Sequence, residues 1–139
     1  MALEKYTGSC HCGAIRFEAE LDLEEGSNRC NCSYCAKARA WFAFAKGEER
    51  FRLLDGSGAS EYRWTPPGRS EAHLTYTFCR SCGIRTFARG NVESLGGIFH
   101  AIHLPTLDLS PERFAAIPVR YVNGREGRFD QMPEHPNAI

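Results

Sequence analysis

Apolar and polar side chains alternate along much of the chain, which is the pattern of a β-strand with one buried face. Between residues 14 and 20, the apolar Ile15, Phe17 and Ala19 alternate with charged side chains. Comparable alternation or strand-forming composition recurs further on, at residues 40–46, 51–54, 61–64, 72–78, 84–88, 97–104 and 119–122. The pattern predicts a mainly β fold.

Helix signals are few and short. Residues 33–40 have the composition for one or two helical turns. A second helix is predicted to start after Ser110, which suits the N-cap, with Pro111 at the first helical position, and to end before Pro118. No internal repeat or low-complexity linker divides the chain, so we expect one domain over residues 1–131 and a loose tail over residues 132–139.

The charge balance argues against two classes of partner. The chain of 139 residues carries 17 basic and 17 acidic side chains, and its calculated isoelectric point is near 6.9. We expect no nucleic-acid partner, because no basic stripe is present. We also expect no membrane span, because no window approaches the ~18 to 20 apolar residues that a bilayer requires.

The amino-terminal segment bears on the redox state of the thiols. It reaches a charged residue at Glu4 without the apolar stretch of a secretory signal. We therefore expect a cytoplasmic protein, in a compartment where thiols stay reduced. Metal ligation explains its cysteines better than disulfides do.

Seven cysteines fall into three short groups, at residues 10–12, 30–35 and 79–82. An odd number leaves one thiol over in any disulfide pairing, whereas two tetrahedral zinc sites can share seven as four plus three. Four thiolates close a zinc ion and make it structural; three leave one position for a water or a substrate, as in a catalytic site. This count makes an enzyme the leading interpretation.

The group at residues 79–82 has the spacing of a zinc knuckle, and the group at residues 10–12 shares one feature with it. Cys79-x-x-Cys82 and Cys10-x-Cys12 are each followed directly by a glycine, which relaxes a tight turn so that backbone N–H groups can face the sulfurs. One pair from each of two distant hairpins could build a four-cysteine site. The alternative for an isolated C-x-x-C is a redox dithiol.

The third group can hold a metal without help from elsewhere, since Cys30, Cys32 and Cys35 lie within six residues. Ser33 is a plausible N-cap, which would place these thiolates at a helix start, where N–H groups stabilise negative sulfur. An anionic thiolate set activates water less than neutral histidines do, and its softness suits an exchangeable sulfur ligand. An open position here would favour a thiol or thioether substrate.

A fourth protein ligand would instead make this second zinc structural too. The possible donors are several carboxylates and the histidines His11, His73, His100 and His103. The last two are three apart in a predicted strand, so they should face opposite sides and cannot easily serve one metal together. His11, between two ligands, is expected to face solvent.

The ligand pattern does not fit a zinc deaminase. A zinc deaminase needs a glutamate two residues after its first ligand, where this chain has Cys32, and a proline before its C-x-x-C pair, which is missing.

Lys37 and Arg39 could attract an anionic thiol or could form a solvated basic helix face. The aromatic side chains at 41, 42 and 44 could wall a pocket, but core packing is the stronger expectation.

The residues at 8–17, 30–35 and 78–83 resemble the glutathione-dependent formaldehyde-activating (GFA) and centromere-protein-V-like family, over roughly residues 5 to 105. The resemblance implies a β-tent fold of packed β-hairpins held by zinc. It also implies how the ligands divide: Cys10, Cys12, Cys79 and Cys82 around a structural zinc, and Cys30, Cys32 and Cys35 around a catalytic one.

The resemblance implies a carbon–sulfur lyase that joins formaldehyde to glutathione or another small thiol. We therefore expect a zinc enzyme with two zinc ions per chain, a small thiol and a small aldehyde as substrates, and no nominated protein acid or base. The alternative is a non-catalytic, zinc-stabilised β module that binds a partner. A redox dithiol protein is the third interpretation.

Overall fold

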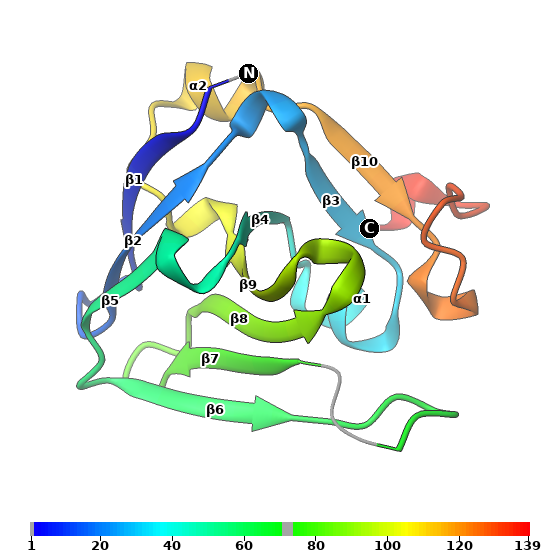
Figure 1. Cartoon of the computed structure of the whole chain (residues 1–139), viewed down its shortest axis with the longest axis horizontal. Coiled ribbons are helices and arrows are strands. Elements are labelled where there is room, and N and C mark those ends of the chain that lie inside the picture. Colours follow the sequence, from blue (N-terminus) through cyan, green and yellow to red (C-terminus); the bar gives the residue numbers. More distant parts are fainter. Residues whose placement is uncertain (1, 71–73) are drawn as a thin grey trace.

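The computed structural model describes residues 2–70 and 74–139, which form two β-sheets and two short helices (Figure 1). The smaller sheet has the strand order β1 (Glu4–Ser9), β2 (Arg16–Leu21), β5 (Phe51–Asp55). The larger has the order β10 (Val119–Val122), β3 (Ser27–Cys30), β4 (Phe42–Lys46), β9 (Gly97–His103), β8 (Arg85–Val92), β7 (Thr75–Cys79), β6 (Ala59–Arg63). The predicted mainly β fold is confirmed.

Neighbouring strands run antiparallel except for β3 and β10, which pair in parallel. Two strands, β1 and β3, were not predicted, because both are polar and short of β-branched residues. β1 gains its place by pairing with β2 along its whole length, and β3 by pairing with β10. For the strand predicted at residues 72–78, positions 72 and 73 lie outside the described residues, and β7 begins at Thr75.

The centre of the seven-stranded sheet is buried on both faces. Along β9, Ile102 joins the core that the sheet shares with the smaller sheet, where Phe17 is fully buried. Phe99 and Ala101 join a second core on the opposite face, which Tyr34 of α1 (Ser33–Ala38) partly covers. Alternation along one strand thus supplies both cores.

The α1 helix starts where the sequence predicts, but with a different cap. The N-cap is Cys32 rather than Ser33, and the Cys32 sulfur accepts the N–H of Cys35 at 3.3 Å. The helix ends at Arg39, whose φ of 53° lies in the left-handed region that glycine usually occupies at this position. Cys32, a candidate metal ligand, therefore also caps the first turn of α1.

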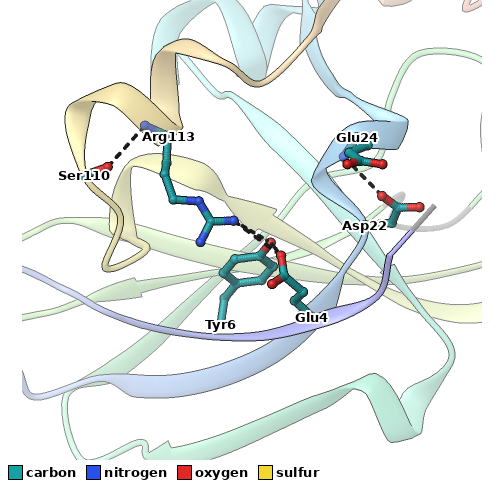
Figure 2. Close-up of polar contacts among 6 residues, drawn as sticks. All are labelled: Glu4, Tyr6, Asp22, Glu24, Ser110 and Arg113. Carbon is teal, nitrogen blue, oxygen red and sulfur yellow. Dashed lines mark hydrogen bonds and ion pairs between the residues drawn. The ribbon is translucent and has the colours of Figure 1, made fainter.

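The second helix, α2 (Pro111–Ala115), has the predicted cap: the Ser110 hydroxyl accepts the N–H of Arg113. Figure 2 shows how α2 is tied to β1, with Arg113 reaching back over the first strand. Its guanidinium donates to the Glu4 carboxylate at 3.3 Å and to the Tyr6 hydroxyl at 3.2 Å. This contact ties α2 to β1 of the smaller sheet.

The final residues make specific contacts with the rest of the chain. Pro133 is buried, and residues Pro136–Ala138 form a 3-10 turn. The Ala138 carbonyl accepts a hydrogen bond from the Arg39 guanidinium at the end of α1. None of the helices in the described residues is long and apolar enough to cross a membrane.

Candidate metal centres

All seven cysteines are described and all are free thiols. They gather into two groups whose sulfurs lie within 4.8 Å of one another. The four-cysteine cluster is Cys10, Cys12, Cys79 and Cys82; the three-cysteine cluster is Cys30, Cys32 and Cys35. The fold therefore makes the division that the family resemblance implied.

Two similar turns build the four-cysteine cluster, one between β1 and β2 and the other between β7 and β8. In each turn the N–H of the first cysteine donates to the carbonyl five residues later, at 3.1 Å in residues 10–15 and 3.0 Å in residues 79–84. The glycines after the second cysteines have positive φ, 83° at Gly13 and 76° at Gly83. The predicted role of these glycines is thus confirmed.

The sulfur geometry fits a tetrahedral ion. The Cys12 sulfur lies 3.7 Å from that of Cys10 and 3.6 Å from that of Cys79. Tetrahedral zinc with Zn–S bonds of ~2.3 Å separates its sulfurs by about 3.8 Å. Backbone N–H groups also face the sulfurs, from Ile15 to Cys10 at 3.3 Å and from Ser81 to Cys79 at 3.4 Å. The four residues fit one zinc ion.

The turn at residues 56–59 packs against both knuckles. Gly58 is buried, and its N–H donates to the Ala14 carbonyl at 3.1 Å. A side-chain carbon at Gly58 would lie 2.6 Å from the Ala14 methyl and 3.2 Å from the Cys79 sulfur. Arg80 closes the contact from the other side by donating to the Ala59 carbonyl at 2.9 Å.

The three-cysteine cluster spans the end of β3 and the first turn of α1. The N–H of Cys32 faces the Cys30 sulfur at 3.4 Å, and that of Cys35 faces the Cys32 sulfur at 3.3 Å. Cys35 is buried, whereas Cys30 and Cys32 are half-buried. Hydrogen bonds from the Cys30 and Cys35 thiols lower the pKa of Cys32, whereas hydrogen bonding with Cys30 and Cys32 raises the pKa of Cys35. This set of donors is suited to a soft divalent cation.

A fourth side-chain ligand for this cluster is missing among the described residues: no histidine, aspartate or glutamate there joins the group. His11 is exposed, as predicted. His73 lies outside the described residues.

The two histidines of β9 lie on opposite faces of the strand, as predicted. His100 is buried and stacks on Phe51, with ring centroids 4.0 Å apart. His103 lies on the other face, 6.1 Å from the Phe42 ring, and accepts the N–H of Trp41 at 3.5 Å. Burial lowers the pKa of both imidazoles to about 4. Both therefore serve as neutral packed rings.

One group of residues at the three-cysteine cluster escaped sequence reasoning. Asn31 donates to the Asn123 side chain at 3.0 Å and accepts the N–H of Arg125 at 2.9 Å. Between these two partners, Gly124 lies so close to Cys30 that a side-chain carbon at Gly124 would collide with its sulfur. These positions are more than 90 residues apart, and nothing in the sequence links them. The parallel pairing of β3 with β10 brings them together in the fold.

A groove of about 610 Å³ lies beside the three-cysteine cluster. One wall is α1, through Ser33, Tyr34 and Lys37, the first two of which stand between metal-ligand positions. The other wall comes from the β6 and β7 hairpin and the start of β8.

The aromatic residues at 41, 42 and 44 pack against the two cores, which confirms the expectation of core packing.

The family model for the glutathione-dependent formaldehyde-activating enzyme matches residues 5–122. The chain belongs to this GFA family. The match covers both cysteine clusters, both β-sheets and the groove.

A solved structure supports the same fold. The crystal structure of a Rhodobacter sphaeroides protein, a structural-genomics target, is 26% identical in sequence and superposes with a TM-score of 0.63. The similarity covers 82% of this chain and 99% of that one. The GFA fold therefore accounts for most of the chain.

Proposed function

We propose that this protein is a zinc-dependent enzyme of the carbon–sulfur lyase type, acting on the adduct of a small thiol and a small aldehyde. The observation that carries the proposal is the three-cysteine cluster, which gains no fourth side-chain ligand from the described residues and whose intervening residues Ser33 and Tyr34 line a groove of about 610 Å³. The description of the GFA family, with formaldehyde and glutathione in it, supports the reaction class.

The two clusters are suited to different roles. Cys10, Cys12, Cys79 and Cys82 provide a complete tetrahedral set, so we assign them a structural zinc. Cys30, Cys32 and Cys35 provide three ligands, so we assign them the catalytic zinc. A zinc ion there would supply positive charge that favours the ionised form of a thiol.

The chain's own residues would position the reactants. Ser33 and Tyr34 place the three-cysteine cluster at the edge of the groove, so a thiol lying in the groove can direct its sulfur toward the cluster. In the synthetic direction the sulfur bonds to the aldehyde carbon, and the proton that leaves the thiol ends on the former carbonyl oxygen. The reverse reaction splits the same carbon–sulfur bond. No protein acid or base is assigned to either proton transfer.

Exchange NMR tests this function directly. In the presence of zinc-loaded protein, formaldehyde and glutathione (or a simpler thiol) should exchange with their hydroxymethyl adduct. This exchange should be faster than in the presence of the same concentration of free zinc. Cys35→Ala should remove the acceleration. Absence of acceleration for every thiol tried would contradict the lyase proposal.

Cobalt substitution separates this proposal from a purely structural role. An added small thiol should change the visible spectrum of cobalt at the three-cysteine cluster, since that site offers an exchangeable position. If both cobalt sites ignore thiols, the non-catalytic, partner-binding module becomes the better interpretation.

A further inference from the structure

Both walls of the groove carry aromatic and cationic side chains. Tyr34 and Lys37 come from consecutive turns of α1, and facing them are Tyr62, Trp64, Phe78 and Arg85. Its volume of about 610 Å³ is within the range of ~300 to 1,000 Å³ that small-molecule sites occupy. The groove is therefore large enough for a ligand well beyond a simple alkyl thiol.

Aromatic rings form its apolar surface. Tyr34 stacks on Tyr76 at 3.7 Å between ring centroids and lies 6.1 Å from Tyr62, with the two rings inclined by 15°. Tyr62 remains 49% exposed, although an aromatic side chain of this size is ordinarily more buried. The exposed ring lies at the groove, where a planar group could stack on it.

The charges at the groove all have one sign. Lys37 and Arg85 are exposed, and the groove lining within residues 2–70 and 74–139 includes no carboxylate. Within the described part of the chain, neither cation has an ion pair, whereas Lys46 pairs with Glu25 at 2.7 Å. The Arg85 guanidinium lies 6.0 Å from the centre of the Tyr34 ring. An acidic group beside an aromatic ring would therefore meet complementary partners.

We propose that the groove binds the body of the thiol substrate, and that this body carries an aromatic ring together with a carboxylate. The inference rests on the proposed function, because it places the sulfur of that molecule at the three-cysteine cluster. Tyr62 and Trp64 contact the ring, while Lys37 and Arg85 contact the carboxylate. The bound thiol is then an aromatic acid rather than a flexible peptide.

Three probe thiols test this substrate class on the zinc-loaded protein by isothermal titration calorimetry. They are 4-(mercaptomethyl)benzoate, which has both groups, benzyl mercaptan, which has only the ring, and 3-mercaptopropionate, which has only the carboxylate. We expect the first to bind about tenfold more tightly than either of the others. Equal affinities for the three probes, or tighter binding of glutathione than of the aromatic acid, would overturn the inference.

Variants show which side chains make each interaction. Replacing both cations (Lys37→Gln with Arg85→Gln) should weaken 4-(mercaptomethyl)benzoate about tenfold and leave benzyl mercaptan unchanged. Tyr62→Leu should weaken both aryl thiols and leave 3-mercaptopropionate unchanged. Arg63→Gln is the matched control, because it removes a cation next to Tyr62 on the other side of β6 and should change none of the three affinities. Equal losses with Arg63→Gln and with the double variant would refute a specific carboxylate contact.

A probe without sulfur separates this inference from the proposed function. 4-Methylbenzoate should shift the NMR signals of Tyr62, Trp64 and Lys37 in the zinc-loaded protein, even if no thiol reaches the metal. If it shifts none of them while 3-mercaptopropionate still binds the cobalt form, the groove inference fails and the lyase proposal stands. If it binds and every thiol is ignored by the cobalt, the groove inference stands as an aromatic-acid site and the lyase proposal fails.

Discussion

The two cysteine clusters reach similar sulfur geometry by different routes. The four-cysteine cluster joins residues 10–12 to residues 79–82, two turns that belong to different sheets. The three-cysteine cluster lies within residues 30–35 and is organised by the first turn of a helix. A metal at the first cross-links distant hairpins, whereas a metal at the second closes a short loop. We therefore expect a metal at the four-cysteine cluster to stabilise the fold more than a metal at the three-cysteine cluster does.

Their surroundings differ in the same sense. Cys10 and Cys79 are only 2% and 0% exposed, although Cys12 is exposed, and the buried Gly58 packs against the Cys79 sulfur. The three-cysteine cluster borders the groove on one side and residues Gly124–Glu126 on the other. Its neighbours therefore include a ligand-sized space and a surface turn, although Phe78 and Gly83, next to ligands of the four-cysteine cluster, line the same groove.

Removing one ligand from each cluster should give the largest difference. Cys82→Ala should unfold or severely destabilise the chain, because structural zinc contributes apparent binding free energies of ~10 to 16 kcal/mol in small zinc peptides. Cys35→Ala should cost less stability while abolishing thiol binding. Urea denaturation in constant zinc, with a metal count per chain, measures both effects. Equal collapse of the two variants would mean that neither site is specialised.

Two closely packed glycines, the buried Gly58 and the half-buried Gly124, allow each cluster to be disturbed without replacing a ligand. Gly58→Ala would press on the Ala14 methyl and the Cys79 sulfur, and Gly124→Ala on the Cys30 sulfur. We expect each to cost about 1 to 3 kcal/mol, as overpacking of a filled site does. Gly58→Ala should lower the free energy of unfolding and weaken the four-cysteine metal, whereas Gly124→Ala should release the three-cysteine metal first.

Competition with a chelator, followed by the cobalt spectra of the two sites, distinguishes these losses. Gly96→Ala, outside both metal-binding turns, serves as a control for backbone strain, since its φ of 84° disfavours alanine although nothing lies near the new carbon. If both Gly58→Ala and Gly124→Ala release the same metal first, the clusters are not independent.

The sequence predicts more of the metal ligands than of their surroundings. Alternation identified β2, β9 and most other strands, and the spacing of the cysteines pointed to two metal sites. β1 and β3 could not be found in this way, because their residues are polar and their pairing depends on distant partners. The groove was missed for the same reason: Tyr34 and Tyr62 belong to separate segments that meet only in the folded chain.

Acid should release both metals, and buried His100 adds an acid destabilisation of its own that must be separated from metal loss. Burial, reinforced by Arg89 and opposed by Glu48, lowers the pKa of His100 to about 4. In the unfolded chain the imidazole takes its proton near pH 6.5, so between pH 6.5 and pH 4 only the unfolded state binds it. Stability from this group is therefore present at neutral pH and is lost as the pH falls through that window.

The variant His100→Phe should remove this sensitivity while keeping the stack on Phe51. Between pH 7 and pH 5 the original chain should lose about 2 kcal/mol more of its unfolding free energy than the variant does. Urea titrations at both pH values in the same excess of zinc make the comparison, because metal loss is then common to both chains. Identical pH slopes would show that His100 does not titrate in this window.

The smallest expected effect concerns Asn31, which stands between two ligands of the three-cysteine cluster. None of its hydrogen bonds among the described residues is to a sulfur. Its amide joins Asn123 and the backbone of Arg125, and its own carbonyl accepts the Arg125 guanidinium at 3.0 Å. Because these bonds hold Gly124 against Cys30, Asn31→Ala should weaken metal binding at this cluster about tenfold, as loss of a supporting hydrogen bond does.

Asn31→Asp sharpens the test, since it keeps an acceptor for the Arg125 N–H, loses the donor to Asn123, and adds a negative charge near the Arg125 guanidinium. Its metal affinity should lie between those of Asn31→Ala and the original chain, and the four-cysteine metal should remain unchanged in both variants. Chelator competition on the cobalt form measures the two sites separately. A general fall in unfolding free energy with no selective metal loss would make Asn31 a fold-stabilising residue only, and the link from β10 to the three-cysteine cluster would then have no chemical consequence.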